Sequence, residues 1–236
     1  WTGTEVEGVV RASGRRLDTE ESQWFGLKAH ARHVPLTADL EMHSLPDGYV
    51  GISRLASDRV NVCGLFRRSG AHVRSRGPQV QLSPGASNAR SLAWKTRLSG
   101  PPGTTLHARL QDAQFEEASL CSVAGLCLKP RLTGSRAECR IGDALTMTPP
   151  VTGNGMSMAL EAAGLAIGPL AAYSRGELPW PAACGAVARG CHDAFASRLA
   201  WAQWLHWVMF TPLLRPFTGL LLSSGVLWRT LSAKTC

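Results

Sequence analysis

Three features that could do chemistry lie close together in one stretch of the chain. Gly142-Asp143 follows a short apolar run, so we expect a carboxylate just beyond a strand end. Pro149-Pro150 predicts a rigid, extended turn, because proline locks its own φ and restricts the residue before it. Gly153-Asn154-Gly155 then opens an expected helix over Met156–Ala172 and leaves its first N–H groups without side-chain cover. Such a helix start suits a flat, partly anionic ligand that comes close to the backbone.

The pattern GDA…PP…GxGMxxAxE at Gly142–Glu161 resembles the second flavin-binding segment of the para-hydroxybenzoate-hydroxylase-type flavoproteins. Within that superfamily the chain is most similar to the geranylgeranyl-reductase-related FAD oxidoreductases, over roughly residues 9 to 210. The resemblance implies that the aspartate bonds the ribityl chain of FAD and that the glycine-started helix faces the pyrimidine edge of the ring. The residues that it assigns to the cofactor are Gly142, Asp143, Pro149, Pro150, Gly153, Asn154, Gly155 and Met156.

The chain departs from that family where the ADP part of FAD would bind. Such enzymes begin with a strand, a GxGxxG turn and a helix, and no GxGxxG occurs here. Val9–Arg16 resembles a strand and turn in which many relatives carry Asp-Gly, but the pair here is Ser13-Gly14. Because the sequence opens at Trp1, inside the later part of the implied dinucleotide domain, we expect a fragment without its N-terminal portion rather than a form that has lost a leader.

The implied fold class is α+β, derived from an α/β parent. It is para-hydroxybenzoate hydroxylase-like, with an antiparallel β substrate domain, a partial FAD-binding domain and C-terminal helices. The expected divisions are the end of the FAD-binding domain at 1–22, the β-rich substrate domain at 23–133, the flavin-binding return segment and helix at 134–175, and a C-terminal helical cap or membrane-contacting tail at 176–236. A length of 236 residues permits one large or two small domains.

Alternating apolar and polar residues predict strands in the β-rich part. The alternation occurs at Leu27–Arg32 and around Leu40–His43, and Asp47-Gly48 predicts a hairpin turn between strands. Further strands are expected at Arg59–Phe66 and Ser119–Leu128. An irregular stretch with one short helix is expected at Val73–Gly103, and helical structure is expected from Glu177 onward.

Alternation also groups polar side chains by face. It places Lys28, His30 and Arg32 on one face of the first strand, and Glu41 with His43 on one face of the next. Glu41 or His43 could donate a proton or anchor a substrate near the flavin. The alternative, which we favour, is a polar stripe that faces solvent, because antiparallel sheets commonly have one wet face. No residue is assigned to catalysis.

Charge and cysteine content restrict the partners. The formal charge of +8 fits either attraction to nucleic acid or anionic lipid, or the unbalanced part of a longer protein with anionic ligands. The arginines are scattered and no nucleic-acid motif is present, so we expect no nucleic-acid partner. The seven cysteines form neither a CxxC pair nor a Cys/His group suited to zinc, and no metal is expected. Most are expected to be buried thiols, with Cys139 nearest the flavin segment.

The C-terminal tail is unusually apolar. A helix is expected at Phe195–Phe210, followed by the apolar stretch Thr211–Trp228, which Pro212, Arg215 and Pro216 interrupt. Its uninterrupted part is only about half of the ~20 residues that span a membrane. A buried cap helix and an interfacial anchor are both compatible with this pattern. We therefore expect a cytoplasmic protein and leave peripheral membrane contact as an alternative.

Three functions are compatible with these patterns. The preferred one is an FAD-dependent oxidoreductase, present as a fragment, that acts on a small apolar or aromatic metabolite such as an isoprenoid or polyketide. NAD(P)H or an external donor would supply its electrons. A flavin monooxygenase of the same superfamily is the second, although the Trp-x-Trp-x-x-Pro signature of flavin halogenases is absent. A non-catalytic, membrane-associated remnant is the third.

Overall fold

The structure is a computed structural model that describes residues 7–14, 24–67, 87–126, 128, 138–150 and 153–211. These residues belong to two compact units. One unit is Asp18–Cys127, and the other joins Trp1–Leu17 to Leu128–Cys236. The first unit corresponds to the β-rich domain that the sequence placed at 23–133, and the finer division of the rest into 1–22, 134–175 and 176–236 stays a prediction.

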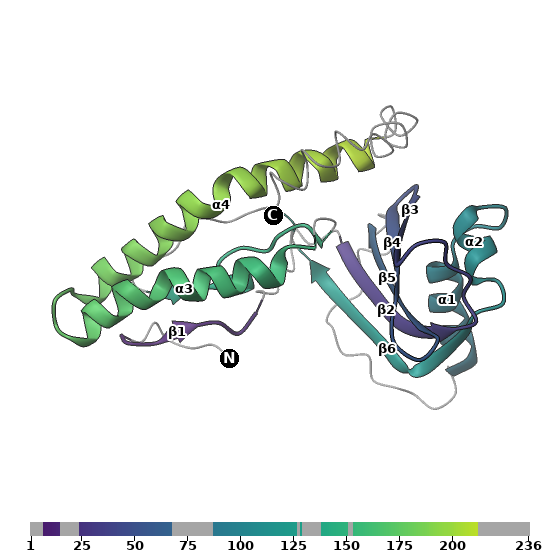
Figure 1. The fold of residues 1–236 in the computed structure, drawn as a ribbon, viewed down its shortest axis with the longest axis horizontal. Coiled ribbons are helices and arrows are strands. Elements are labelled where there is room, and N and C mark those ends of the chain that lie inside the picture. The colour runs from purple at the N-terminus through teal and green to yellow at the C-terminus, as the bar shows by residue number, and fades with distance from the viewer. Residues whose placement is uncertain are drawn as a thin grey trace. The chain divides into compact units, whose positions relative to one another are not determined.

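The unit Asp18–Cys127 is built on a five-stranded antiparallel sheet with the strand order β3-β4-β5-β2-β6 (Figure 1). Its strands are β2 (Trp24–Arg32), β3 (Leu40–Leu45), β4 (Gly48–Arg54), β5 (Arg59–Arg67) and β6 (Gln114–Leu126). The predicted strands are confirmed, with β6 beginning at Gln114 rather than at Ser119. Two helices follow β5, α1 (Ser87–Ser99) and α2 (Thr105–Leu110), and α1 is the helix expected within Val73–Gly103.

The predicted hairpin connects β3 to β4, but its glycine has a different role from the one expected. Leu45 pairs with Gly48, so Pro46 and Asp47 form the turn and Gly48 is already in the strand. A Cβ atom on Gly48 would lie 2.2 Å from the carbonyl oxygen of Leu65. Close approach of the backbone of β5 to Gly48, rather than turn geometry, therefore requires glycine here.

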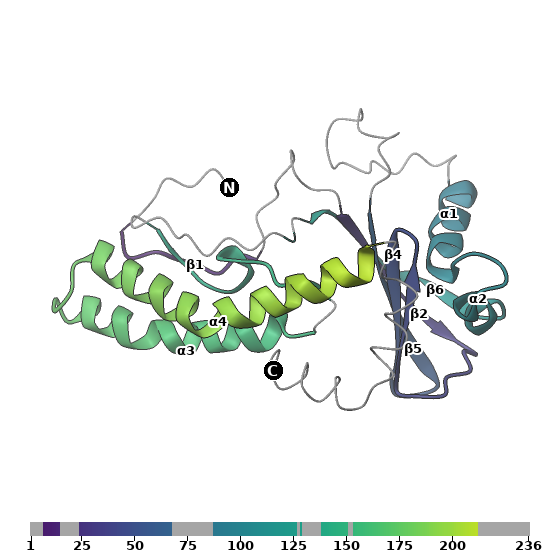
Figure 2. The same cartoon turned by 90° about the horizontal axis from the view of Figure 1, so that it is seen from above.

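The core of this unit lies on one face of the sheet, where α1 and α2 pack (Figure 2). Side chains alternate between the two faces along each strand. Those that point toward the helices are small or β-branched except for Leu45 and Phe66, and Leu98 of α1 with Leu106 of α2 packs against them. The buried strand residues of this cluster are Ala29, Ala31, Leu45, Val50, Ile52, Val60, Val62 and Phe66.

The other unit combines a small parallel sheet with two long helices. β1 (Val10–Arg11) pairs in parallel with β7 (Cys139–Arg140). A short 3₁₀ helix, η2 (Gly142–Ala144), leads toward α3 (Gly155–Ser174), and α4 (Trp180–Phe210) follows. α3 confirms the helix predicted at Met156–Ala172, and α4 confirms the helical character expected from Glu177 onward. The strand expected within Val9–Arg16 is limited to β1 among the described residues.

α3 and α4 lie side by side and run in opposite directions (Figure 1). Buried residues of α4 recur at helical spacing, as in Cys184, Val187, Cys191 and Phe195, and pack against α3 and β7. Arg198 of α4 donates two hydrogen bonds to Glu161 of α3, at 2.5 and 3.3 Å. Apolar packing and this bidentate ion pair together fix the register of the two helices.

The side of α3 that faces away from α4 is apolar and open. Met156, Leu160 and Ile167 are 82%, 76% and 69% exposed. Within the described part of the chain, α3 is the one helix long and apolar enough to cross a membrane, with a mean hydropathy of 1.3. Core helices of soluble proteins meet the same criterion. The apolar tail on which the membrane alternative was based lies, beyond Thr211, outside the described residues.

Candidate functional site

The predicted cofactor segment begins where β7 leads into η2. Gly142 has φ = +59°, a left-handed conformation that L side chains rarely adopt. A Cβ atom there would also lie 3.2 Å from the Cβ atom of Ala159 in α3. The carbonyl oxygen of Gly142 accepts hydrogen bonds from the backbone N–H groups of Leu145 and Thr146. Gly142 therefore turns the chain tightly and brings η2 against the first turns of α3.

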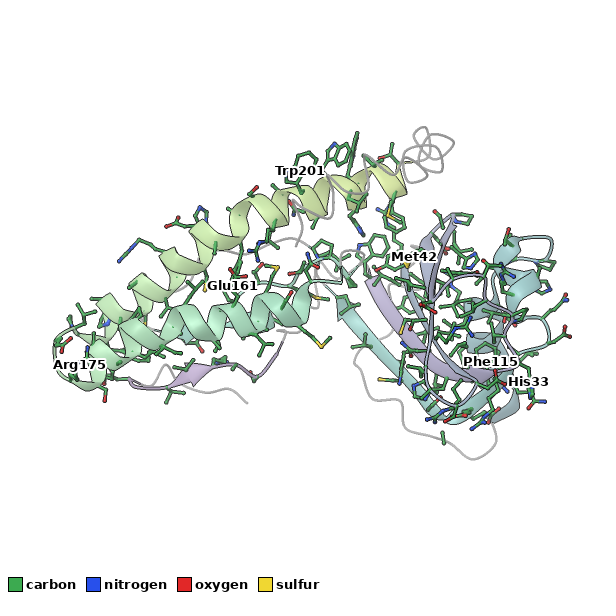
Figure 3. The ribbon with its side chains drawn as sticks, viewed as in Figure 1. His33, Met42, Phe115, Glu161, Arg175 and Trp201 are labelled. Atoms are coloured by element: carbon green, nitrogen blue, oxygen red, sulfur yellow. The ribbon has the colours of Figure 1, made fainter. Side chains whose placement is uncertain are left out.

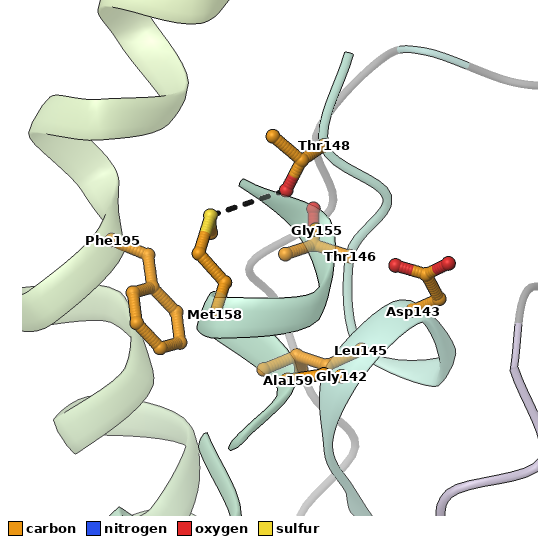
Figure 4. A pocket seen from close by; sticks show the side chains of 9 residues that line it. All are labelled: Gly142, Asp143, Leu145, Thr146, Thr148, Gly155, Met158, Ala159 and Phe195. Carbon is orange, nitrogen blue, oxygen red and sulfur yellow. Dashed lines mark hydrogen bonds between the residues drawn. The ribbon is translucent and has the colours of Figure 1, made fainter. Parts of the chain in front are cut away.

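A small hollow lies between η2, the first turns of α3 and α4 (Figure 4). The exposed Asp143 is at one side of it and Phe195 of α4 is at the opposite side. The buried Thr148 donates a hydrogen bond from Oγ1 to Sδ of Met158, at 3.2 Å. The lining residues are Gly142, Asp143, Leu145, Thr146, Thr148, Gly155, Met158, Ala159 and Phe195. The hollow therefore has a carboxylate, two buried hydroxyl side chains and an apolar floor.

The start of α3 is open to an incoming molecule. Gly153 has φ = +70°. Among the described residues, and apart from the adjoining backbone, no atom lies within 4 Å of the position where a Cβ of Gly153 or Gly155 would be. Asn154, the N-cap residue, makes no side-chain capping hydrogen bond, and the first turn contains no acidic residue. Helix starts carry partial positive charge on free N–H groups. This end of α3 can therefore accept an anionic edge of a ligand at close range.

The structure brings together some of the eight predicted residues but not all of them. Gly142, Asp143 and Gly155 line the hollow. Pro149 is buried and Pro150 is exposed, both beside the hollow rather than in its wall, as are Gly153 and Asn154. Met156 is 82% exposed and belongs to the outer side of α3.

Sequence reasoning missed six residues of the wall, which are Leu145, Thr146, Thr148, Met158, Ala159 and Phe195. Thr146 and Thr148 lie within the predicted segment, and both are buried polar residues in an extended stretch. Met158 is on the predicted helix, one turn beyond Asn154. Phe195 is far along the chain, and only the packing of α4 on α3 places it here. The one local sequence pattern that indicated this wall was the alternation of Thr146 and Thr148 in the extended stretch before α3.

The cysteine nearest the hollow is not set up for redox chemistry. Cys139, Cys184 and Cys191 are free and buried. Burial raises the pKa of the Cys139 thiol to about 11, and Cys184 beside it adds to the effect. Such a thiol is protonated at neutral pH, and it is the thiolate that reacts. Within the described ranges, no group of three or more His, Cys, Asp or Glu side chains could hold a metal ion.

Glu41 and His43 share one face of β3, as predicted, but neither interpretation of them is correct. They lie on the helix-covered face, and their side chains are only 11% and 12% exposed. Arg109 of α2 donates from Nε to Glu41 at 3.0 Å, and the Thr37 backbone N–H donates at 2.7 Å. Burial lowers the pKa of His43, although Glu41, 3.3 Å away, opposes this effect. The cluster connects β3 to α2 and is neither a solvent-facing stripe nor an open substrate anchor.

No protein-family model and no curated protein matches the chain, but solved structures do. The flavin-dependent brominase Bmp2 superposes over 96% of this chain and 56% of its own, with a TM-score of 0.63 and 15% identity. Tetracycline destructase Tet(51) matches 96% of this chain and 60% of its own, with a TM-score of 0.55 and 11% identity. PqsL, a probable FAD-dependent monooxygenase from Pseudomonas aeruginosa, matches 91% and 58%, with a TM-score of 0.52 and 18% identity.

These matches establish the fold. The chain has the α+β architecture found in flavin-dependent halogenases and monooxygenases, with an antiparallel sheet and a helical unit, and the predicted fold class is confirmed. The chain spans a little more than half the length of the structures that it matches.

Proposed function

We propose that the chain is the ring-binding and substrate-binding part of an FAD-dependent oxidoreductase that acts on an apolar or aromatic metabolite. The observation that carries the proposal is the hollow at the start of α3. There, open space at Gly155 adjoins the Asp143 carboxylate and the N-terminus of α3. The fold, which this chain shares with flavin-dependent enzymes, supports the same conclusion.

The residues at the hollow fit one end of FAD. The edge of the ring would enter the space that a Cβ on Gly153 or Gly155 would fill. Asp143 would accept hydrogen bonds from the ribityl hydroxyls, and the first N–H groups of α3 would face the pyrimidine edge. Negative charge at that edge is stabilised by the helix dipole by about 0.3–1 kcal/mol, and up to ~2 kcal/mol when partly buried. Bound FAD supplies the hydride or oxygen chemistry, and this chain orients the ring and keeps water from it.

The ADP half of FAD would be held by a nucleotide-binding region of the parent fold, for which this sequence has no GxGxxG. Two features favour association with such a region. Parallel sheets are normally larger than two strands and covered on both faces, whereas β1 and β7 form a pair alone among the described residues. The outer side of α3 is an apolar surface of the kind that folded proteins cover.

Reduction and oxygenation of the substrate are the two versions of this function. The resemblance of the sequence to geranylgeranyl-reductase-related enzymes favours reduction. The probable monooxygenase among the matched structures favours oxygenation, with electrons from NAD(P)H or an external donor. A cytoplasmic location is part of the proposal. Peripheral membrane contact would be the alternative to association with a nucleotide-binding region, because it would use the same outer side of α3.

A flavin titration of the purified chain, followed by visible absorbance and fluorescence quenching, tests the proposal. Asp143→Ala should weaken binding by about tenfold, because a charged hydrogen bond is lost. Asp193→Ala, which removes an exposed carboxylate of α4, is the matched control. Gly155→Val should abolish ring binding, and Gly190→Val of α4, whose Cβ also enters open space, should not.

All four variants should keep the helical circular dichroism and the melting temperature of the parent chain. Saturable binding that fails only in Asp143→Ala and Gly155→Val would support the proposed site. A folded chain that binds no flavin, or loses flavin equally in all four variants, would contradict it.

A further inference from the structure

The exposed face of α4 changes character along the helix. From Arg189 onward its exposed residues recur at helical spacing, as expected for one side of a helix. Those up to Ser197 are polar or charged, whereas the last two are tryptophans. In chain order the exposed residues are Arg189, His192, Asp193, Ser197, Ala200, Trp204 and Trp207. A face that begins as a polar surface therefore ends as an aromatic one.

Three tryptophans lie at this end of α4. Trp204 and Trp207 are 43% and 58% exposed. Trp201 packs edge-to-face against Trp204 with the ring centroids 5.6 Å apart, and Figure 3 shows Trp201 on the side of α4 that points away from α3. Other side chains of the same turns are buried, among them Leu205 and Val208. The packing of α4 therefore does not account for the tryptophans, which we call the tryptophan surface.

Exposed indole rings grouped on one side of a helix indicate a partner, because folded proteins rarely leave large apolar side chains together on their surface without one. Tryptophan combines a wide apolar ring with a single N–H donor. This combination is favoured where an apolar phase meets water, and tryptophan is accordingly enriched at the headgroup level of membranes. The boundary region of a lipid bilayer therefore suits both parts of these side chains.

The charge of the sequence favours one kind of bilayer. From residue 194 to the last residue there is no aspartate and no glutamate. Arg198 is held by Glu161 of α3, so its charge is compensated. Three more basic residues follow the tryptophan surface in the sequence, namely Arg215, Arg229 and Lys234. They lie outside the described residues and enter the argument through their charge alone. Tryptophans in a segment with excess positive charge fit a bilayer that contains anionic lipid.

We propose that the tryptophan surface binds the surface of an anionic lipid bilayer, with its indole rings in the headgroup region. The cytoplasmic leaflet of membranes is anionic, so this contact is compatible with a cytoplasmic location. The inference goes beyond the proposed function and requires no bound flavin. Because the contact uses α4, it leaves the outer side of α3 free for a nucleotide-binding region.

Co-sedimentation of the purified chain with lipid vesicles tests the role of charge. One set of vesicles contains phosphatidylcholine alone, and the other contains phosphatidylcholine with phosphatidylserine. The chain should bind the second set more tightly by about fivefold or more, since each basic residue near an anionic surface contributes about that factor. Added salt should weaken this binding, because it screens the charges.

Paired substitutions test the role of the tryptophans. Trp204→Gln combined with Trp207→Gln removes both exposed rings and should weaken binding to the anionic vesicles by about tenfold or more. Leu160→Gln combined with Ile167→Gln removes exposed apolar side chains of α3 and should leave this binding unchanged. Leu92→Gln, at an exposed position of α1, is a further control.

Binding that is absent, or equal for the two sets of vesicles, would overturn the proposal. Binding lost in the α3 variant and kept in the α4 variant would do so as well, because the contact would then be on α3. A dimer in sedimentation velocity that the α4 variant dissociates, without vesicle binding, would mean that a second copy covers the tryptophan surface instead. Melting temperatures identify misfolded variants, and Trp207→Gln alone keeps the test decisive if the double variant is unstable.

Discussion

Glu41 shows how a half-buried carboxylate can stabilise a fold through its hydrogen bonds. Burial alone would raise the pKa of Glu41, but hydrogen bonds from Thr37 and Arg109 outweigh burial and hold it below its usual range. Glu41→Gln should therefore lower the free energy of unfolding at pH 7 by about 1–3 kcal/mol. Glu117→Gln, at a more exposed ion pair on β6, should lower it by less than about 1 kcal/mol.

The pH dependence of the Glu41 effect follows from the same pKa. A carboxylate with a lowered folded pKa stabilises the protein fully above its unfolded pKa and loses that effect as pH falls through the folded value. The difference between the parent chain and Glu41→Gln, measured by denaturant unfolding, should shrink from pH 7 to acidic pH. A difference that stays constant over this range would show that the carboxylate charge is not what stabilises the contact.

His206 should make the helical unit sensitive to mild acid. Burial lowers the pKa of this side chain on α4 to about 4, so the folded protein holds it neutral. The unfolded chain takes up the proton near pH 6.5. Its contribution to stability is therefore complete above about pH 6.5 and falls as pH decreases toward about 4. Between pH 7 and pH 5 the melting temperature of His206→Leu should fall less than that of the parent chain; equal falls would contradict this assignment.

At the residue scale, the sequence predicted those residues of the hollow that lie close together along the chain. Gly142, Asp143 and Gly155 were predicted because a strand end, a proline turn and a helix start lie within one short segment. Phe195 and Met158 could not be predicted as neighbours, since their contact depends on the α3–α4 packing. Glu41 and His43 were assigned correctly to one face, but alternation does not tell which face of a sheet receives the helices.

Gly48 and Gly155 are glycines for different reasons. Strand packing requires Gly48, whereas Gly155 is proposed to leave space for a ligand. A Cβ on Gly48 would lie 2.2 Å from the Leu65 carbonyl oxygen, whereas a Cβ on Gly155 would meet nothing within 4 Å. Gly48→Ala should therefore lower the free energy of unfolding by about 1–3 kcal/mol. Gly155→Ala should leave it unchanged or raise it by less than about 1 kcal/mol, because alanine favours a helix. Denaturant unfolding of both variants measures the contrast.

If Gly155→Ala were as damaging as Gly48→Ala, the glycine at the start of α3 would be a requirement of the fold. The open space at Gly155 would then no longer support a ligand site there. If instead the Gly155→Ala chain is stable but binds flavin more weakly, the added Cβ atom affects binding and not folding.

Element positions were largely predictable because each has a simple period. The strands alternate polar with apolar, and α4 repeats buried residues such as Val187, Cys191 and Phe195 at helical spacing. The pair Asp47-Gly48 predicted the hairpin correctly. The reason for glycine differs from the expected one, because Gly48 is required by the close approach of β5 and not by the turn. The division of the chain was less predictable, because only contacts across the chain join Val10 to Cys139.

At the scale of the whole molecule, the proposed cofactor site includes groups for only one end of FAD. The hollow contains groups suited to the ring and ribityl chain. Among the described residues, β1 and β7 form a parallel sheet of two strands, and the outer side of α3 is apolar and exposed. Parallel sheets are normally larger and covered on both faces. The matched structures are almost twice as long as the part that this chain covers. A chain organised in this way should recognise the part of FAD that FMN also contains.

We therefore expect FMN and FAD to bind the purified chain with equal affinity, within about threefold, since the adenosine part of FAD would add less than about 1 kcal/mol. ADP should not displace either flavin, and Asp143→Ala should weaken both to the same extent. Isothermal titration of FMN, FAD and ADP, with the last also tested as a competitor, measures these affinities directly. Tight binding of FAD with weak binding of FMN, or displacement of FAD by ADP, would mean that this chain holds the adenosine half through residues other than a GxGxxG turn. The hollow at the start of α3 would then be only one part of a complete FAD site.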